Sequence, residues 1–598
     1  MQSAPTAKPA PRFLWLLLCI AIAAVVNVSG WWLPNHPVQV GHDPKGPKLG
    51  MIESVSFAPF RRGQGPLNKV YPTPEQVIED LHSLKGIARG VRTYTAREGL
   101  EILPPEAAKL NMNVMQGVWL GPERDINEKE VEAAIALANK YPDAIKSLVV
   151  GNEVLLRKDL PVDELIGYIR RIKAAVKQPV TYADVWEFWL RFPQLLNEVD
   201  FVTVHFLPYW EDMPIAASHS MPHIMDVYRT VQAKLPGKPI TIGEVGWPSE
   251  GRSRRDAVPS RTEAAGFIAD FMRLAEAEKL SYNLVEAFDQ PWKEKLEGTV
   301  GAAWGVLDEL RQPKFDVGGK VSNLPEWPLF AGLAVLISLI LLVLHAQALI
   351  QLPASGIAAT VFFVQGLGAL LSAAIERGLE YNYSALHVTH ATVLVVVQGT
   401  FAVLLLRELL ERLGGQPHPA GAVQSLGDSL KLLRHPRAAV AAATRAQTAD
   451  WIYGLLALWM VYHGIMLVAA GRYRDFPMDY FLLPVAGLIT LRLLVLWMAP
   501  APAGSDDGLG RFALAAGFID PRQETAGARL KLGCETVLVF LLLSLPVLVL
   551  LLEKPSNREA VYWCLLTVAY ALPLAGNLAL GLRHRQGVAA PVASKASA

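Results

Sequence analysis

The sequence predicts an α/β fold, a (β/α)8 TIM barrel, joined to an all-α bundle of transmembrane helices. Three observations carry this prediction. First, 52% of the 598 residues are hydrophobic, which is high for a soluble protein. Second, the long apolar runs lie toward the two ends, whereas the stretch from about residue 40 to 320 is charged like a globular domain. Third, strand-like and helix-like segments alternate within that stretch.

By composition the chain divides into six parts. They are an N-terminal transmembrane anchor or signal-like segment over 1–35, a linker over 36–50, a TIM-barrel domain over 51–318, a linker over 319–327, a transmembrane bundle of about seven helices over 328–585, and a cytoplasmic tail over 586–598. In the first part, Lys8 and Arg12 precede an apolar run, as in a signal peptide or an uncleaved anchor. Extended to Trp32 the run is long enough to span a membrane, which favours the anchor.

Eight apolar or β-branched segments predict the barrel strands. They are Ile52–Ala58, Gly90–Tyr94, Asn113–Leu120, Ile145–Val150, Val180–Asp184, Phe201–Phe206, Ile240–Ile242 and Tyr282–Phe288. A capping box at Thr73 and Gln76 and a start signal at Ser260 open two of the intervening helices. Strand count and domain size are those of a (β/α)8 barrel. The alternative, a doubly wound open sheet, would call for a Gly-rich phosphate loop after the first strand, and the sequence has none there.

In such a barrel, active residues lie at the C-terminal ends of the strands. Two glutamates, Glu153 after the fourth strand and Glu244 after the seventh, occupy such ends, and aromatic residues crowd most of the others. Two opposed carboxylates can cut a glycosidic bond, one protonating the leaving oxygen and the other attacking the anomeric carbon. Their repulsion helps to separate their pKa values. Packing is the ordinary alternative for part of the aromatic residues.

The motifs around these glutamates resemble those of a known family. Gly151-Asn152-Glu153 and Gly243-Glu244-Val-Gly-Trp-Pro-Ser249 resemble the motifs of glycoside hydrolase family 17, a retaining, β-1,3-glucan-active family of barrels. The resemblance covers about residues 50–318. It implies that Glu153 is the general acid/base and Glu244 the nucleophile. It also points to substrate-binding residues around them: Tyr94, Asn152, Tyr209, Trp247, Glu286, Trp292 and Lys293.

Within that set, the resemblance implies that Asn152 holds the 2-hydroxyl of the sugar and that Trp247 stacks on a ring. Tyr94 and Tyr209 would line the reacting subsite. Three positions depart from the plant endoglucanases of the family, which typically carry Asn and Tyr where this chain has His205 and Leu207, and Glu where it has Gln290. Linkage and acceptor preference therefore do not carry over from the plant enzymes.

Other classes of function find little support. The net charge of +1 and the lack of a basic stripe argue against a nucleic-acid partner. The three cysteines, Cys19, Cys534 and Cys564, all fall in apolar runs, so no disulfide framework or Cys-based metal site is predicted. We expect no metal and no cofactor.

Seven apolar runs of spanning length follow the barrel. They lie near 328–350, 354–376, 386–407, 450–470, 478–499, 532–552 and 560–582, and the N-terminal segment makes eight. Arg407–Arg445, Arg511–Lys531 and the tail hold most of the Lys and Arg of the connecting segments. The positive-inside rule then predicts an inner (cell) membrane protein with both termini cytoplasmic and the barrel outside, which is the periplasm of a Gram-negative cell.

A barrel tethered to eight spans suits a polymer processed as it emerges from the membrane. The layout resembles bacterial membrane-anchored members of the family, including β-1,6-glucan synthases of periplasmic glucan production. We therefore expect a transglycosylase that cleaves β-1,3-glucan and transfers glucosyl units to glucan acceptors, with β-1,6 branches or cyclic glucan among the conceivable products. Its partners would be a β-glucan oligo- or polysaccharide, the lipid bilayer and a glucan synthase. The alternatives are a hydrolytic endo-β-1,3-glucanase and a non-catalytic glucan-binding module of a membrane exporter.

Overall fold

A computed structural model of the chain describes residues 10–41, 49–380, 384–415, 442–498 and 526–589. The chain divides into two compact units, one over His36–Asn323 and one made of the segments on either side of it. The predicted basic loops Arg407–Arg445 and Arg511–Lys531, the tail 586–598 and the linker 36–50 lie partly outside the described residues.

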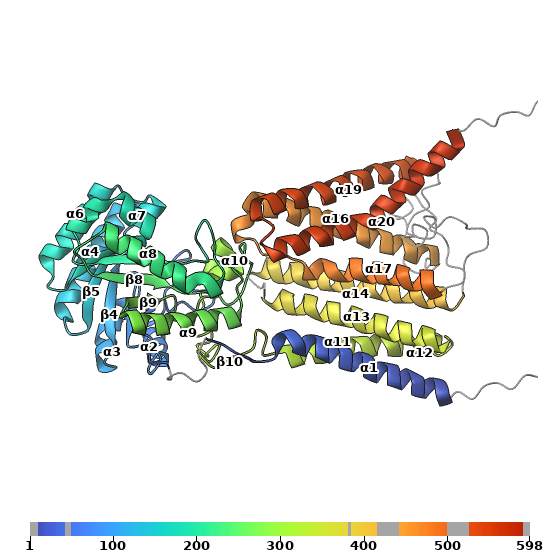
Figure 1. Ribbon diagram of the computed structural model, residues 1–598, viewed down its shortest axis with the longest axis horizontal. Helices are drawn as coiled ribbons and strands as arrows, with labels where there is room; N and C mark the ends of the chain where they lie inside the picture. Colours follow the sequence, from blue (N-terminus) through green and yellow to red (C-terminus); the bar gives the residue numbers. More distant parts are fainter. Residues whose placement is uncertain (1–9, 42–48, 381–383, 416–441, 499–525, 590–598) are drawn as a thin grey trace, which may run out of the picture. The chain divides into compact units, whose positions relative to one another are not determined.

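The described part of the first unit contains a closed barrel of eight parallel strands in chain order (Figure 1). The strands are β2 (Val55–Ser56), β3 (Gly90–Arg92), β4 (Asn113–Val118), β5 (Ile145–Asn152), β6 (Val180–Val185), β7 (Val202–Phe206), β8 (Ile240–Val245) and β9 (Ser281–Leu284). Pairing of Val55 with Leu284 closes the barrel. Each predicted strand segment overlaps one observed strand, and the predicted fold class is confirmed.

Helices lie outside the strands (Figure 1). They are α2 (Pro74–Ser83), α3 (Leu103–Lys109), α4 (Arg124–Lys140), α5 (Val154–Arg157), α6 (Val162–Ala175), α7 (Trp186–Arg191), α8 (Ser220–Lys234), α9 (Arg261–Glu278) and α10 (Glu294–Ala302). Both predicted start signals operate. The Thr73 hydroxyl accepts from the Gln76 backbone at 3.3 Å, and the Ser260 hydroxyl accepts from the Glu263 backbone at 3.1 Å.

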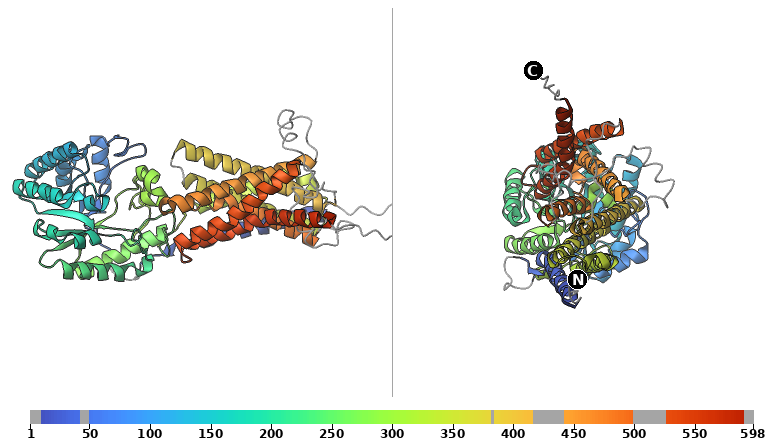
Figure 2. Two further views of the ribbon diagram at one scale, coloured as in Figure 1. Left: turned by 90° about the horizontal axis from the view of Figure 1, so that it is seen from above. Right: turned by 90° about the vertical axis from the view of Figure 1, so that its right-hand side faces the viewer.

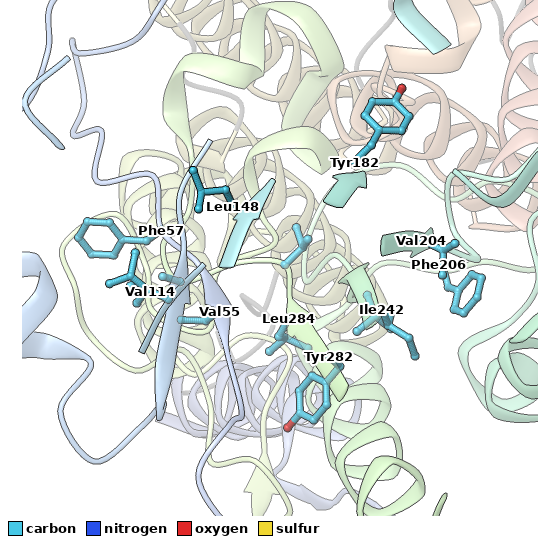
Figure 3. Packing of buried hydrophobic residues seen from close by; sticks show 14 of the residues in the cluster. Val55, Phe57, Val114, Leu148, Tyr182, Val204, Phe206, Ile242, Tyr282 and Leu284 are labelled. Carbon is cyan, nitrogen blue, oxygen red and sulfur yellow. The ribbon is translucent and has the colours of Figure 1, made fainter. Parts of the chain in front are cut away.

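The strands alternate between two kinds of buried side chain. Apolar residues such as Val55, Val204 and Ile242 belong to a continuous core with the apolar faces of the helices (Figure 3). Between them lie polar residues that bond to one another across strands. The hydroxyls of Thr181 and Thr203, for example, are 2.9 Å apart. This alternation is the period-2 pattern of a strand that is buried on both faces.

Strand β8 differs from its prediction in a way that matters for the site. The strand was expected to end at Ile242, yet it continues to Val245, so that Glu244 lies within the ladder. Its pairing with β7 shifts by one residue at Gly243, a β-bulge. A Cβ atom on Gly243 would lie 2.5 Å from the Thr203 side chain, so only glycine fits. Bulges of this kind re-aim neighbouring side chains, here that of Glu244.

The segments that enter and leave the barrel unit run side by side. Strand β1 (Val38–Gln39) pairs in antiparallel fashion with β10 (Lys320–Val321). The Val40 amide donates to the Gly319 carbonyl at 3.0 Å. Val40 and Val321 share a small apolar cluster with Ala265 of α9. We call this pair of segments the entry–exit ribbon.

The second unit is a helical bundle whose helices lie side by side (Figures 1 and 2). Its described helices are α1 (Ala10–Asn35), α11 (Trp327–Leu344), α12 (Ala346–Leu349), α13 (Ala354–Glu380), α14 (Ala385–Leu413), α16 (Ala442–Ala470), α17 (Asp479–Met498), α19 (Ala526–Glu553) and α20 (Arg558–Ala589). Within the described residues, eight helices are long and apolar enough to cross a membrane: all of these except α12.

Contacts between these helices fix their directions. Trp31 near the end of α1 stacks on Phe330 at the start of α11 with 5.9 Å between ring centroids. Trp15 near the start of α1 donates to the Ala354 carbonyl at the start of α13 at 2.9 Å. At the end of α13, Arg377 pairs with Asp479 at the start of α17 at 2.9 Å. By these contacts α1 and α11 run in opposite directions, α1 and α13 in the same direction, and α13 and α17 in opposite directions.

Candidate active site

Glu153 and Glu244 meet at the C-terminal ends of β5 and β8. A carboxylate oxygen of each, together with a ring nitrogen of His205 from β7, lies within 4.8 Å of the other two. Glu153 follows β5 with φ of 52°, a left-handed conformation that is uncommon outside glycine. Its backbone amide donates to the Ala183 carbonyl of the next strand at 2.8 Å, which anchors the turn. The separation of the two carboxylates is close to that in retaining glycosidases and below the range for inverting ones.

Glu244 is held through one of its two oxygens. Arg92 on β3 donates to Oε1 at 3.1 Å, and the Tyr94 hydroxyl donates to the same atom at 2.9 Å. Burial raises the pKa of Tyr94 well above its usual value, so the phenol keeps the proton that it donates. The donors to Glu244 leave Oε2 for another contact. Tyr94, expected to line the sugar subsite, thus bonds directly to the expected nucleophile.

Arg92 also connects the two strand ends. Its side chain is completely buried and donates to the Gly243 carbonyl at 2.7 Å. The other guanidinium nitrogen donates to Oδ1 of Asn152, the residue before Glu153, at 2.5 Å. One buried cation therefore fixes the backbone beside Glu244 and the side chain beside Glu153 in a single geometry.

Glu153 has a different environment from Glu244. Its Oε1 is 2.9 Å from Nδ1 of His205. Burial raises the pKa of Glu153, but the hydrogen bond from His205 and the positive charges of His205, Arg157 and Arg92 outweigh burial and hold it below its ordinary value. Glu153 therefore keeps its ionised form to a lower pH than an ordinary glutamate.

A third carboxylate, Glu286, lies just after β9 and is 1% exposed. It pairs with Lys293 at 3.0 Å, and the Lys293 ammonium lies 5.8 Å from the centre of the Trp292 ring. Burial raises the pKa of Glu286 to about 7, against the lowering effect of Lys293. The structure therefore brings these three predicted residues together. Of the three, Glu286 changes its charge close to neutral pH, whereas the pKa of Lys293, against the lowering effect of burial, is raised by the charge of Glu286 and Lys293 stays charged.

Two predicted aromatic contacts need correction. Trp247 is 1% exposed and stacks on Phe267 of α9 with 5.5 Å between ring centroids, while its ring nitrogen donates to the Val258 carbonyl at 3.1 Å. Tyr209 is fully buried, and its hydroxyl donates to the Arg252 carbonyl at 2.7 Å. Neither ring is open to a sugar, because side chains from other elements cover both.

Other aromatic rings at the strand ends are open to solvent. Trp119, directly after β4, is 37% exposed, and the Arg157 guanidinium lies 4.5 Å from its ring centre. Arg157 also donates to the Asn152 carbonyl at 2.5 Å, which ties this ring to the turn that carries Glu153. Trp210 is partly exposed and stacks on Trp304. Flat rings of this kind bind the apolar face of a sugar.

Several residues of the site were not among the predicted site residues. His205 was noted only as a departure from the plant enzymes, and Arg92 was not among the predicted substrate contacts. Asn283 on β9 donates to the Gly243 carbonyl at 3.1 Å and to the Ser56 hydroxyl at 2.8 Å. Ser56 in turn lies 2.9 Å from the Tyr94 hydroxyl. No sequence signal identifies Asn283 or Ser56, because barrel closure alone brings the first and last strands together.

Comparisons with known proteins find relatives of the barrel part of the chain. A family model described as the BtgE/BtgC glycoside hydrolase domain matches residues 54–305. A glucan 1,3-beta-glucosidase of Candida albicans is 30% identical over 268 residues, which are 40% of this chain and 85% of that protein. A glucan 1,3-beta-glucosidase of Schizosaccharomyces pombe is 27% identical over 261 residues, with 41% and 80% covered. The crystal structure of a glycoside hydrolase family 17 beta-1,3-glucanosyltransferase from Rhizomucor miehei has 27% identity and a TM-score of 0.39, covering 44% of this chain and 95% of that one.

Proposed function

The chain belongs to glycoside hydrolase family 17 through its BtgE/BtgC-type barrel, and from that premise we propose that it is a retaining β-1,3-glucan transglycosylase. It cleaves a β-1,3-glucan and transfers the released glucosyl unit to a glucan acceptor. The observation that carries this proposal is the pair Glu153 and Glu244, held within 4.8 Å on opposite strand ends of the barrel. That separation leaves no room for the water of an inverting mechanism.

In the first half of the reaction, Glu244 attacks the anomeric carbon. Both donors, Arg92 and Tyr94, bond to Oε1, so Oε2 makes the attack. As the bond from Oε2 to the anomeric carbon forms, the glycosidic bond breaks. Glu153 delivers a proton to the departing oxygen. The result is a glucosyl ester on Glu244 and an ionised Glu153.

In the second half, Glu153 acts as a base. It takes the proton from an acceptor hydroxyl, the acceptor oxygen bonds to the anomeric carbon, and the ester to Glu244 breaks. Water and a sugar hydroxyl compete for this step. The exposed ring of Trp119, tied through Arg157 to the Glu153 turn, supports a bound sugar acceptor beside the base. A sugar held there outcompetes water.

We further propose that the bundle anchors the barrel in the cell membrane with the barrel on the periplasmic side. Eight apolar helices support the anchoring, and their alternating directions support an even number of crossings. Phe481 at the start of α17 contacts Trp563 near the start of α20. Helices α1 and α20 therefore have their free ends at one end of the bundle (Figure 1). In the sequence, the basic segments join the end of α14 to the start of α16 and the end of α17 to the start of α19, which supports cytoplasmic termini.

Incubation with laminari-oligosaccharides tests transfer. We expect the purified full-length protein in detergent to give products both longer and shorter than a laminaripentaose substrate. Mass spectrometry measures the lengths, and methylation analysis of the longer products assigns the new linkage as β-1,3 or β-1,6. Products that are only shorter than the substrate would identify a hydrolase instead.

Protease treatment of spheroplasts tests the orientation. In intact spheroplasts, added protease should degrade the barrel, while an epitope tag at the C-terminus stays protected. Permeabilisation should then expose the tag. Loss of the tag before permeabilisation, with an intact barrel, would contradict the proposed topology.

A further inference from the structure

His205 lies between the two carboxylates and faces both. Its Nδ1 is 2.9 Å from Oε1 of Glu153, and its Nε2 is 3.7 Å from Oε1 of Glu244. The imidazole side chain is completely buried. Within the described residues, its Nε2 has no hydrogen-bond partner. A buried ring with one nitrogen toward each carboxylate is positioned to exchange a proton with the pair.

The pairing of β7 with β8 fixes the position of the imidazole ring. His205 and Glu244 are register partners on β7 and β8, directly after the bulge at Gly243. A Cβ atom on Gly243 would lie 3.0 Å from Cδ2 and 3.2 Å from Nε2 of His205. The imidazole therefore packs against the bulge itself. It has little room to turn away from either glutamate.

We propose that His205 is a proton reservoir for Glu153, holding between turnovers the proton that Glu153 delivers to the leaving oxygen. The inference rests on the proposed function, because it takes Glu153 as the acid/base. It assigns a positioning role to His205 rather than contact with the sugar. An asparagine at this place could still donate a hydrogen bond to Glu153, but it could not store a proton.

The proton balance closes over one cycle. At rest the imidazole is charged, with one proton on Nδ1 facing Glu153 and one on Nε2 facing the ionised Glu244. During cleavage the Nδ1 proton passes to Glu153 and on to the departing oxygen, while Glu244 forms its ester. His205 is then neutral. During transfer the proton of the acceptor hydroxyl passes through Glu153 back to Nδ1, and Glu244 is released as a carboxylate.

The surrounding charges suit a stored proton. The other charged groups that face the three residues are Arg92 on β3, Arg157 on α5, Asp184 on β6, Glu286 after β9, Lys293 before α10 and Glu297 on α10. Cations and acids are equal in number in this set. The charge of Glu244 comes on top of that balance, so it favours a proton on the pair made by Glu153 and His205.

The proposal predicts the direction in which the pH profile of kcat/KM shifts when His205 is replaced. Two coupled groups bind the proton more tightly than Glu153 alone, so the wild-type protein keeps it to a higher pH. We expect His205→Asn to move the alkaline limb of kcat/KM for laminari-oligosaccharides to lower pH by about one unit. The rate at the optimum should fall about 10- to 100-fold, at or below the lower end of the range for complete loss of acid–base assistance, because Glu153 itself is kept.

A substrate that needs no proton separates this role from a structural one. Dinitrophenolate leaves without acid assistance, so release of dinitrophenol from a dinitrophenyl β-laminaribioside in the first turnover should change by less than about threefold in His205→Asn. His223→Asn is the matched control, because His223 also bonds a carboxylate, Glu211, at 2.9 Å but on α8. This control should leave both rates and the pH profile unchanged. Each protein is assayed as the full chain in detergent.

The reservoir proposal would be refuted if the alkaline limb of kcat/KM were unchanged in His205→Asn. It would also be refuted if the variant lost activity equally toward laminari-oligosaccharides and the dinitrophenyl substrate. If His205→Asn does not fold, His205→Gln carries the same expectations. Failure of the proposed function looks different, because the wild-type protein would then form no covalent adduct with a 2-deoxy-2-fluoro-laminaribiosyl donor. A wild-type adduct together with an unshifted profile in the variant refutes the reservoir alone.

Discussion

Replacement of Glu244 by glutamine is expected to lower kcat/KM for laminari-oligosaccharides about 10⁵-fold, equivalent to about 7 kcal/mol of transition-state stabilisation. The amide is nearly the same size as the carboxylate but has no charge with which to attack the anomeric carbon. Arg92 and Tyr94, which donate to Oε1 of Glu244, would still have an oxygen to bond. The fold should therefore survive, and the melting temperature checks this.

Two controls make the assignment of Glu244 specific. Glu211→Gln removes a carboxylate that is bonded to His223, and it should stay within about threefold of the wild-type rate. Azide should rescue Glu244→Ala with a dinitrophenyl donor and give the α-glucosyl azide, because azide then takes the place of the missing nucleophile. Near-normal turnover by Glu244→Gln would refute the assignment.

The second large effect is expected at Glu153. Glu153→Gln should lose about 10²- to 10⁴-fold with oligosaccharides, because neither the leaving oxygen nor the acceptor hydroxyl receives proton-transfer assistance. With a dinitrophenyl donor, cleavage should stay fast while transfer becomes slow. Stopped-flow measurements should then show a burst of dinitrophenolate close to one equivalent per enzyme.

Azide distinguishes the two glutamates by the anomer of the product. In Glu153→Gln, azide needs no base and attacks the glucosyl ester, so the β-glucosyl azide should form and the steady-state rate should recover. An α product from Glu153→Gln, or equal losses with both donor types, would mean that the two roles are assigned to the wrong residues. NMR of the anomeric proton separates the products.

The sequence was informative wherever function depends on a local pattern. Glu153 and Glu244 could be found because each ends a strand, and parallel strands of a barrel end on the same face. Their opposition follows from their places on β5 and β8. The eight apolar runs were also predictable, since membrane spanning depends on length and composition along the chain.

The burial of a side chain, unlike its position along a strand, could not be predicted from a motif. Trp247 and Tyr209 follow the C-terminal ends of barrel strands, as a sugar contact requires. Both are buried, however, under Phe267 of α9 and neighbouring aromatic rings. Phe267 comes from the helix that follows the Trp247 motif, and the Tyr209 and Trp247 rings cover each other at 6.0 Å between centroids. A motif gives the position of a residue along its strand, but not what packs over it.

The contacts of His205 with the two glutamates could not be predicted from the sequence either. His205 differs from the residue of the plant enzymes, yet only its 2.9 Å and 3.7 Å distances to the two glutamates give the difference a meaning. The extension of β8 past Ile242 was likewise visible only in the structure. The extension includes the register shift at Gly243, where the Thr203 and His205 side chains of β7 leave room for glycine alone.

The entry–exit ribbon has a consequence for how such a chain can be assembled. Because Val38 pairs with Val321, the barrel unit begins and ends at the same place, as a cassette inserted into a connection between helices α1 and α11. Those helices contact each other directly through Trp31 and Phe330. Recombination that exchanges the cassette needs only two adjacent joints, and the same helical bundle can thereby carry another domain.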